Sequence, residues 1–208
     1  GIGTAFRRLA ELLAHDGHEV TVVFMPFQWH EDYTKKLYEH RSEIKRLKRM
    51  GIDVLFPEQG GIPESHHALP FHEMRSLMVY ETIKSRSFDV IHLADNCGLG
   101  YYALLAKSLG LRFLNTHFVI GAHGSTLWAG EANQRLTVDN LLLAEIDRRC
   151  LELGDSLVSP SAYMLRYIKS LGWKTPRKSL VIPNVNAFEK WKPHPPINPA
   201  KGARELIF

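Results

Sequence analysis

Residues 112–128 read RFLNTHFVIGAHGSTLW, and their pattern is the strongest indication of the fold class. Its first part is an apolar run with β-branched and aromatic residues, which is typical of a strand buried in a parallel sheet. Small and polar residues then replace the apolar ones at Ala122-His123-Gly124-Ser125-Thr126. Ligands of open α/β sheets bind beyond the carboxyl ends of the strands. The stretch therefore predicts a buried strand that presents His123 and Gly124 at a ligand-binding edge.

The rest of the chain alternates short apolar strands with segments of helical periodicity. Strands are expected at 18–25, 52–56, 88–93, 155–159 and 179–182, and helices at 4–16, 31–50, 71–86, 99–109, 133–153 and 161–171. Thr4 and Ser161 are suitable N-caps for the first and last of these helices. This alternation predicts an α/β fold, with a parallel sheet built from βαβ units and helices on both faces.

Composition excludes several classes of protein. The 208 residues carry a net charge of +4, which suits a phosphate-bearing partner but is too small an excess to indicate a nucleic acid. The sequence shows neither a membrane-spanning run nor a secretory signal, and Cys97 and Cys150 have no metal or redox spacing, so a cytoplasmic location is expected. His66, His67 and His72 lack companion ligands, so no metal site is predicted. The basic segment 35–49 allows peripheral contact with anionic lipid, but its Glu39 and Glu43 favour a solvated helix face.

Three junctions carry residues suited to chemistry. Gly1-x-Gly3-Thr4 precedes a helix and could approach a phosphate, although Phe6 replaces the third glycine of a dinucleotide fingerprint, and an ordinary turn is an equal alternative. Asp95 follows the strand at 88–93 and could accept sugar hydroxyls or act as a base, with helix capping as the alternative. His123 combines placement at a strand end with an imidazole that can donate or accept a proton.

Weaker candidates surround these junctions. Trp128 could stack on a sugar ring, or it could simply pack. Ser161 and Asn184 follow the strands at 155–159 and 179–182, where turn and cap chemistry is the plain interpretation. His92 and His117 are expected to pack within the sheet.

Four blocks in order resemble the N-terminal domain of retaining glycosyltransferases of family 4, also called group 1. They are GIGTAFRRLAELLAHDGHEVTVV, FDVIHLADNCGLGYYALLAKSLGL, AHGSTLW and the run LELGDSLVSPSAYMLRYIKSLGW with SLVIPNV. The resemblance implies a GT-B fold, in which two Rossmann-like domains face each other across a cleft. It also implies transfer of a sugar from a nucleotide-sugar donor, with retention at the anomeric carbon and without a metal or other cofactor.

The resemblance also implies roles for individual residues. Gly1, Gly3 and Thr4 match the loop that approaches the donor phosphates and the acceptor. His123 matches a histidine that contacts the donor sugar near the reacting centre, and Asp95 lies where acceptor contacts are often made. These two residues are the expected catalytic pair, and the substrate-binding set is completed by Gly124, Trp128, Ser161 and Asn184.

Residues 1–183 are expected to form the acceptor-side domain, and 184–208 a proline-rich linker with the first strand of a second domain. On this interpretation the chain is part of a larger enzyme and is inactive alone. The expected partners are a nucleotide sugar and a glycan or lipid-linked acceptor, as in polysaccharide biosynthesis, with peripheral contact at the inner membrane face left open. Two alternatives stay open: a non-catalytic half-domain that binds sugar or acceptor, and a nucleotide-sugar epimerase of GT-B fold.

Overall fold

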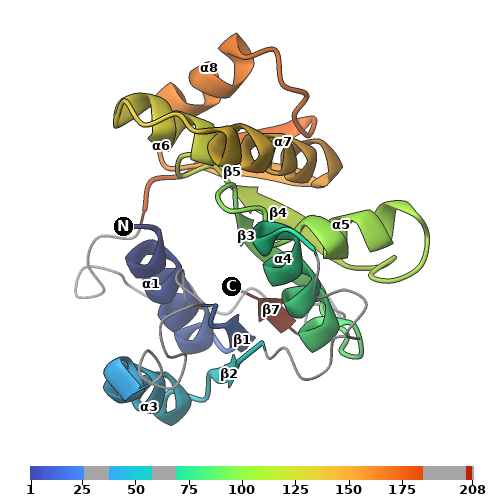
Figure 1. Ribbon diagram of the computed structural model, residues 1–208. Helices are drawn as coiled ribbons and strands as arrows, with labels where there is room; N and C mark the ends of the chain where they lie inside the picture. Colours follow the sequence, from blue (N-terminus) through green and yellow to red (C-terminus); the bar gives the residue numbers. More distant parts are fainter. Residues whose placement is uncertain (26–37, 58–68, 185–204, 208) are drawn as a thin grey trace.

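The computed structural model describes residues 1–25, 38–57, 69–184 and 205–207. The strands within these ranges form one parallel sheet. The strand order is β2-β1-β7-β3-β4-β5-β6 (Figure 1). The strands are β1 (Glu19–Val23), β2 (Asp53–Leu55), β3 (Val90–Ala94), β4 (His117–Gly121), β5 (Ser156–Ser159), β6 (Lys178–Val181) and β7 (Glu205–Ile207). The predicted α/β fold with a parallel sheet is confirmed.

Helices flank this sheet, as the alternation of patterns predicts. They are α1 (Ile2–His15), α3 (Arg41–Arg49), α4 (Phe71–Ile83), α5 (Tyr101–Ser108), α6 (Thr126–Ala132), α7 (Val138–Leu153) and α8 (Ala162–Ser170). In Figure 1, α1 and α3 lie on the left of the sheet, α4 and α5 lie on its right, and α6, α7 and α8 lie beside its upper end.

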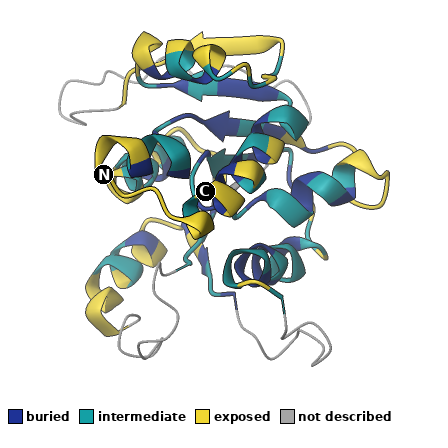
Figure 2. Ribbon diagram, turned by 45° about the horizontal axis from the view of Figure 1, so that its top comes forward, coloured by how far each residue is buried: buried dark blue, intermediate teal, exposed yellow. Residues whose placement is uncertain are grey.

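The core is largest where β3, β4 and β5 meet α4, α5, α7 and α8. Phe118 and Ile120 of β4 are fully buried there and pack with the inward residues of the helices. A smaller cluster joins α1 and α3 to β1 and β2 through Ala10, Val20 and Leu47. Figure 2 shows the buried strands at the centre and the exposed helix faces around them. The carboxyl ends of β3 and β4 therefore lie beside the larger of these two clusters.

Three expectations about element boundaries are corrected. The first helix begins at Ile2 with Gly1 as its N-cap, so Thr4 lies inside α1 and does not cap it. The helix expected over 133–153 begins only at Val138, as α7, and a short helix that was not expected, α6, precedes it; Gln134, with a left-handed φ of 53°, lies between the two. The buried strand expected within residues 112–128 begins only at His117, which is exposed and hydrogen-bonds Ser156 at the amino end of the sheet.

The short strand β7 differs from expectation in its partners. It was expected to open a second domain, yet it pairs with β1 on one side and β3 on the other, at the centre of this sheet. Residues 185–204, which connect it to β6, lie outside the described residues. The proposed division of the chain at residue 184 therefore stays a prediction.

The basic helix α3 docks on α1 through ion pairs. Arg46 pairs with Glu11, and Arg7 of α1 pairs with Glu43 at 3.1 Å. These intramolecular partners favour the solvated-face interpretation of this segment over lipid contact. Within the described ranges, no helix has both the length and the apolar character needed to cross a bilayer.

Candidate functional site

The carboxyl ends of β3 and β4 lie side by side, and the two strongest candidates follow directly from them. Ala94 and Gly121 are paired in register, and the backbone N–H of Asp95 donates to the carbonyl of Gly121 at 3.0 Å. This register brings Asp95 next to His123, two residues beyond Gly121. The structure thus brings together the two residues that the sequence analysis placed on one edge.

Asp95 is buried, with only 1% of its surface exposed, and its carboxylate faces the loop that follows β4. Its Oδ1 accepts hydrogen bonds from the backbone N–H groups of His123 at 2.9 Å and Gly124 at 3.2 Å. Burial raises the pKa of Asp95 to about 7, although these N–H groups favour the ionised form. The alternative that Asp95 caps the next helix is wrong, because α5 begins after Gly100 and has no side-chain cap. The carboxylate instead holds the His123 loop in place.

His123 lies half-buried between this loop and α1. Its ring centroid is 5.5 Å from that of Phe6, which also lies 4.9 Å from the ring of His92 in β3. Burial lowers the pKa of His123, and burial with the nearby His123 lowers the pKa of His92 to about 4. Both imidazoles are therefore neutral near pH 7. A neutral His123 can accept or donate a hydrogen bond to a bound sugar.

Gly124 needs to be glycine for two reasons. Its φ is 132°, a conformation that other residues rarely adopt, and an added Cβ would stand 2.7 Å from Cε3 of Trp128. Trp128 lies in the first turn of α6, and its indole N–H donates to the hydroxyl of Tyr163 at 3.2 Å. The ring thus packs over Gly124, and stacking of Trp128 on a sugar stays a prediction.

The glycine-rich start of the chain is the first turn of α1. Phe6, one turn further along, contacts the rings of His92 and His123, so this end of α1 lies at the same edge of the sheet. A Cβ added at Gly1 or Gly3 would meet nothing within 4 Å. The first N–H groups of a helix have no acceptors within it and carry a partial positive charge. An anion could therefore approach the backbone of Gly1 and Gly3 closely, whereas the N–H of Thr4 already donates to the carbonyl of Gly1 at 3.1 Å.

The remaining candidates lie at the neighbouring strand ends. Ser161 accepts a hydrogen bond from the backbone N–H of Met164, so its role as the N-cap of α8 is confirmed. Ser159 is buried and donates to the carbonyl of Ala122 at 2.9 Å, joining β5 to the His123 loop. Asn184 follows β6 and is exposed. Substrate binding by Ser161 and Asn184 stays a prediction.

Sequence reasoning missed Asp147, a fully buried carboxylate in α7. It accepts hydrogen bonds from the backbone N–H groups of Gly98 and Thr126, each at 2.8 Å. Burial raises its pKa to about 7, and the negative charge of Asp95 contributes in the same direction. A signal was available, since Asp147 falls on the same helix face as Leu143 and Leu151, where an apolar residue is expected.

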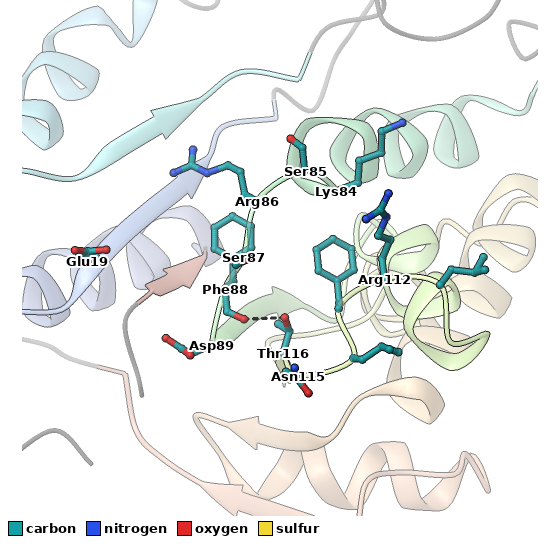
Figure 3. Close-up of a pocket in the computed structure, with 13 residues that line it drawn as sticks. Glu19, Lys84, Ser85, Arg86, Ser87, Phe88, Asp89, Arg112, Asn115 and Thr116 are labelled. Atoms are coloured by element: carbon teal, nitrogen blue, oxygen red, sulfur yellow. Dashed lines mark hydrogen bonds between the residues drawn. The ribbon is translucent and has the colours of Figure 1, made fainter. Parts of the chain in front are cut away.

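A hollow of about 590 Å³ opens at the opposite, amino-terminal edge of the sheet (Figure 3). Lys84, Arg86 and Arg112 lie along it, but Lys84 pairs with Glu81 at 2.5 Å and Arg86 pairs with Asp53 at 2.8 Å. Two of its three cations are therefore already neutralised. This hollow does not belong to the His123 edge.

The described part of the chain contains no group of three His, Cys, Asp or Glu side chains that could hold a metal ion. His72 lies in α4, whereas His66 and His67 lie outside the described residues. The described residues of the site supply backbone N–H groups, neutral imidazoles and buried carboxylates. Such a set can orient a polar, anionic ligand.

Comparison with known proteins is consistent with the α/β fold. The family model described as Glycosyltransferase Family 4 matches residues 1–185. A search of curated proteins gave no significant match.

Proposed function

The chain belongs to glycosyltransferase family 4, and from this premise we propose that it is the acceptor-side domain of a retaining enzyme. The reaction transfers a sugar from a nucleotide-sugar donor to a glycan or lipid-linked acceptor. The observation that carries the proposal is the single edge at which α1 begins and at which Asp95 fixes the His123 loop. The proposal places the protein in the cytoplasm, on a polysaccharide-forming route, and needs no metal or other cofactor.

In this proposal the N-terminal turn of α1 faces the diphosphate of the donor. Glycine at positions 1 and 3 leaves room for the phosphate oxygens, and the helix N-terminus stabilises the charge that develops on the leaving diphosphate. The neutral ring of His123 hydrogen-bonds the donor sugar and orients its anomeric carbon. Gly124 lets the loop turn beside that sugar.

Asp95 enters this scheme through the loop. Its carboxylate is buried and already accepts the N–H groups of His123 and Gly124. It therefore positions His123, and direct contact with an acceptor hydroxyl would require it to turn toward the edge. The same observation favours the second candidate function, a half-domain that binds sugar or acceptor without turnover. Accordingly, we propose that residues 1–208 alone do not catalyse transfer.

The test is a calorimetric titration of UDP- and GDP-sugars into wild-type protein, His123→Ala and His18→Ala. His18 is exposed and directly precedes β1, at the opposite edge of the sheet, so it is the matched control. Weak binding, with a Kd in the millimolar range (about −4 kcal/mol), should be lost in His123→Ala and kept in His18→Ala. Micromolar binding that His123→Ala leaves unchanged would overturn this placement of the site. Sugar transfer by the chain alone would overturn the proposal that it is inactive.

A further inference from the structure

Asp147 stands in the middle of α7 with none of its surface exposed. Its neighbours on the same helix face are Leu143, Ala144 and Leu151, which are buried core residues. Burial of a carboxylate is costly unless hydrogen bonds compensate it. An apolar residue would fill this position at lower cost, so the compensating contacts indicate why a carboxylate is present.

Those contacts reach two separate loops. Oδ1 of Asp147 accepts the N–H of Gly98, which lies three residues after Asp95 in the β3–α5 loop. Oδ2 accepts the N–H of Thr126, which is the first residue of α6 and follows Gly124 by two positions. Each distance is 2.8 Å, which is short for a bond from a backbone N–H group. One side chain therefore ties both loops to α7.

The two loops are also joined to each other above Asp147. Asp95 accepts the N–H groups of His123 and Gly124, and the side-chain amide of Asn96 donates to the carbonyl of Gly124 at 3.1 Å. Gly98 also packs tightly against α7, since a Cβ added at Gly98 would stand 2.5 Å from Cγ2 of Ile146. A shift of α7 at Asp147 would consequently move both ends of this bonded unit.

We propose that Asp147 is a positioning residue of the candidate site, which sets the place of His123 by fixing Gly98 and Thr126 to α7. It touches no reacting group and acts through the loops that Asp95 joins. This inference rests on the proposed function, because it names the group that holds the sugar-binding loop.

The first variant is Asp147→Asn, which keeps the shape of the side chain but replaces one acceptor oxygen with a donor. One loop then faces an N–H group where it needs an acceptor. Asp155→Asn is the control, because Asp155 accepts the N–H of Phe118 at 2.7 Å and pairs with Lys107 at the amino end of β4, away from the site. Both variants remove one carboxylate that is bound to a backbone N–H group.

Two readouts separate positioning from plain stability. Urea unfolding should show a loss of stability in both variants. Only Asp147→Asn should shift the ¹H–¹⁵N resonances of His123 and Gly124 and weaken the nucleotide-sugar titration about tenfold. If Asp147→Asn loses stability but leaves these resonances and the titration unchanged, Asp147 is merely structural and the inference is overturned.

A second variant covers the case in which Asp147→Asn does not fold. Thr126→Pro removes only the donor N–H of this contact and the threonine hydroxyl, and proline suits the first position of a helix. The preceding Ser125 has φ −60° and ψ 165°, which is compatible with a following proline. Thr126→Val, which removes the hydroxyl but keeps the N–H, is its control. Thr126→Pro should shift the His123 resonances more than Thr126→Val does, and equal shifts would overturn the inference.

The same experiments distinguish the two proposals. If wild-type protein binds neither UDP- nor GDP-sugars, the proposed function fails. The resonances of His123 and Gly124 in the Asp147 and Thr126 variants still decide whether Asp147 positions the loop.

Discussion

The backbone N–H of His123 donates to Oδ1 of Asp95 at 2.9 Å, across 28 residues of sequence. This contact joins the ends of two neighbouring strands. It fixes the backbone of His123 and leaves the imidazole ring free of Asp95, so the loop sets where the ring lies. The carboxylate is buried, and it is the acceptor of the N–H groups of both His123 and Gly124. A change at Asp95 should therefore affect both the position of His123 and the stability of the fold.

The first prediction concerns the loss of this acceptor. Asp95→Ala leaves the N–H groups of His123 and Gly124 without an acceptor and should lower the free energy of unfolding by about 3 kcal/mol, whereas Asp95→Asn should cost about 1 kcal/mol because one oxygen remains. Urea unfolding monitored by circular dichroism measures both values. Equal costs for the two variants would show that the hydrogen bonds contribute little.

The second prediction concerns Gly124. Gly124→Ala places a Cβ 2.7 Å from Cε3 of Trp128 at a φ of 132°, so it should destabilise the protein by about 3 kcal/mol and change the fluorescence of Trp128. Gly110→Ala is the control, since Gly110 has φ 74° but open space around it. It should cost only about 1 kcal/mol, for backbone strain alone. A Gly124→Ala protein as stable as Gly110→Ala would show that the loop moves away from Trp128 freely.

The fold followed from the sequence because buried parallel strands and amphipathic helices have distinct periods. His123 and Asp95 were identified because both follow such strands, and the carboxyl ends of parallel strands share one edge. Each residue was identified from its own short stretch of sequence, and the parallel topology brings the two residues together in space.

Features that depend on tertiary contacts were not accessible in the same way. The break between α6 and α7 contains Gln134 in a left-handed conformation. Such a conformation is usually signalled in a sequence by glycine, and here the residue is a glutamine. The three-residue strand β7 pairs with β1 and β3, and a strand this short carries too little pattern to specify those partners. Asp147 lies on an apolar helix face, but its two backbone donors are 49 and 21 residues away.

The third prediction is a pH dependence of stability that arises from Asp147. Its pKa is raised by burial from 3.8 to about 7, so between these values the folded state binds a proton that the unfolded state has lost. Stability contributed by Asp147 therefore falls as pH rises from about 4 to about 7, by at most about 1.4 kcal/mol per pH unit.

The measurement is the difference in unfolding free energy between wild-type protein and Asp147→Asn, taken from urea curves at several pH values. That difference should decrease through this window and then level off. Asp95 lies close by and titrates in the same range, so the Asp95→Asn background sharpens the test. A constant difference from pH 4 to pH 7 would contradict the prediction.

The fourth prediction has the opposite sign and concerns His92. Burial, together with the nearby His123, lowers its pKa from 6.5 to about 4, so between these values the unfolded state binds the additional proton. The difference in unfolding free energy between wild-type protein and His92→Phe should rise with pH from about 4 to about 6.5 and then stay constant, because the neutral ring is the form that the fold accepts. A ¹H NMR titration of the ring protons should place the midpoint for His92 near pH 4. A midpoint near 6.5 would mean that water reaches this ring and that the edge of the sheet beside Phe6 is more open than the contact between the two rings indicates.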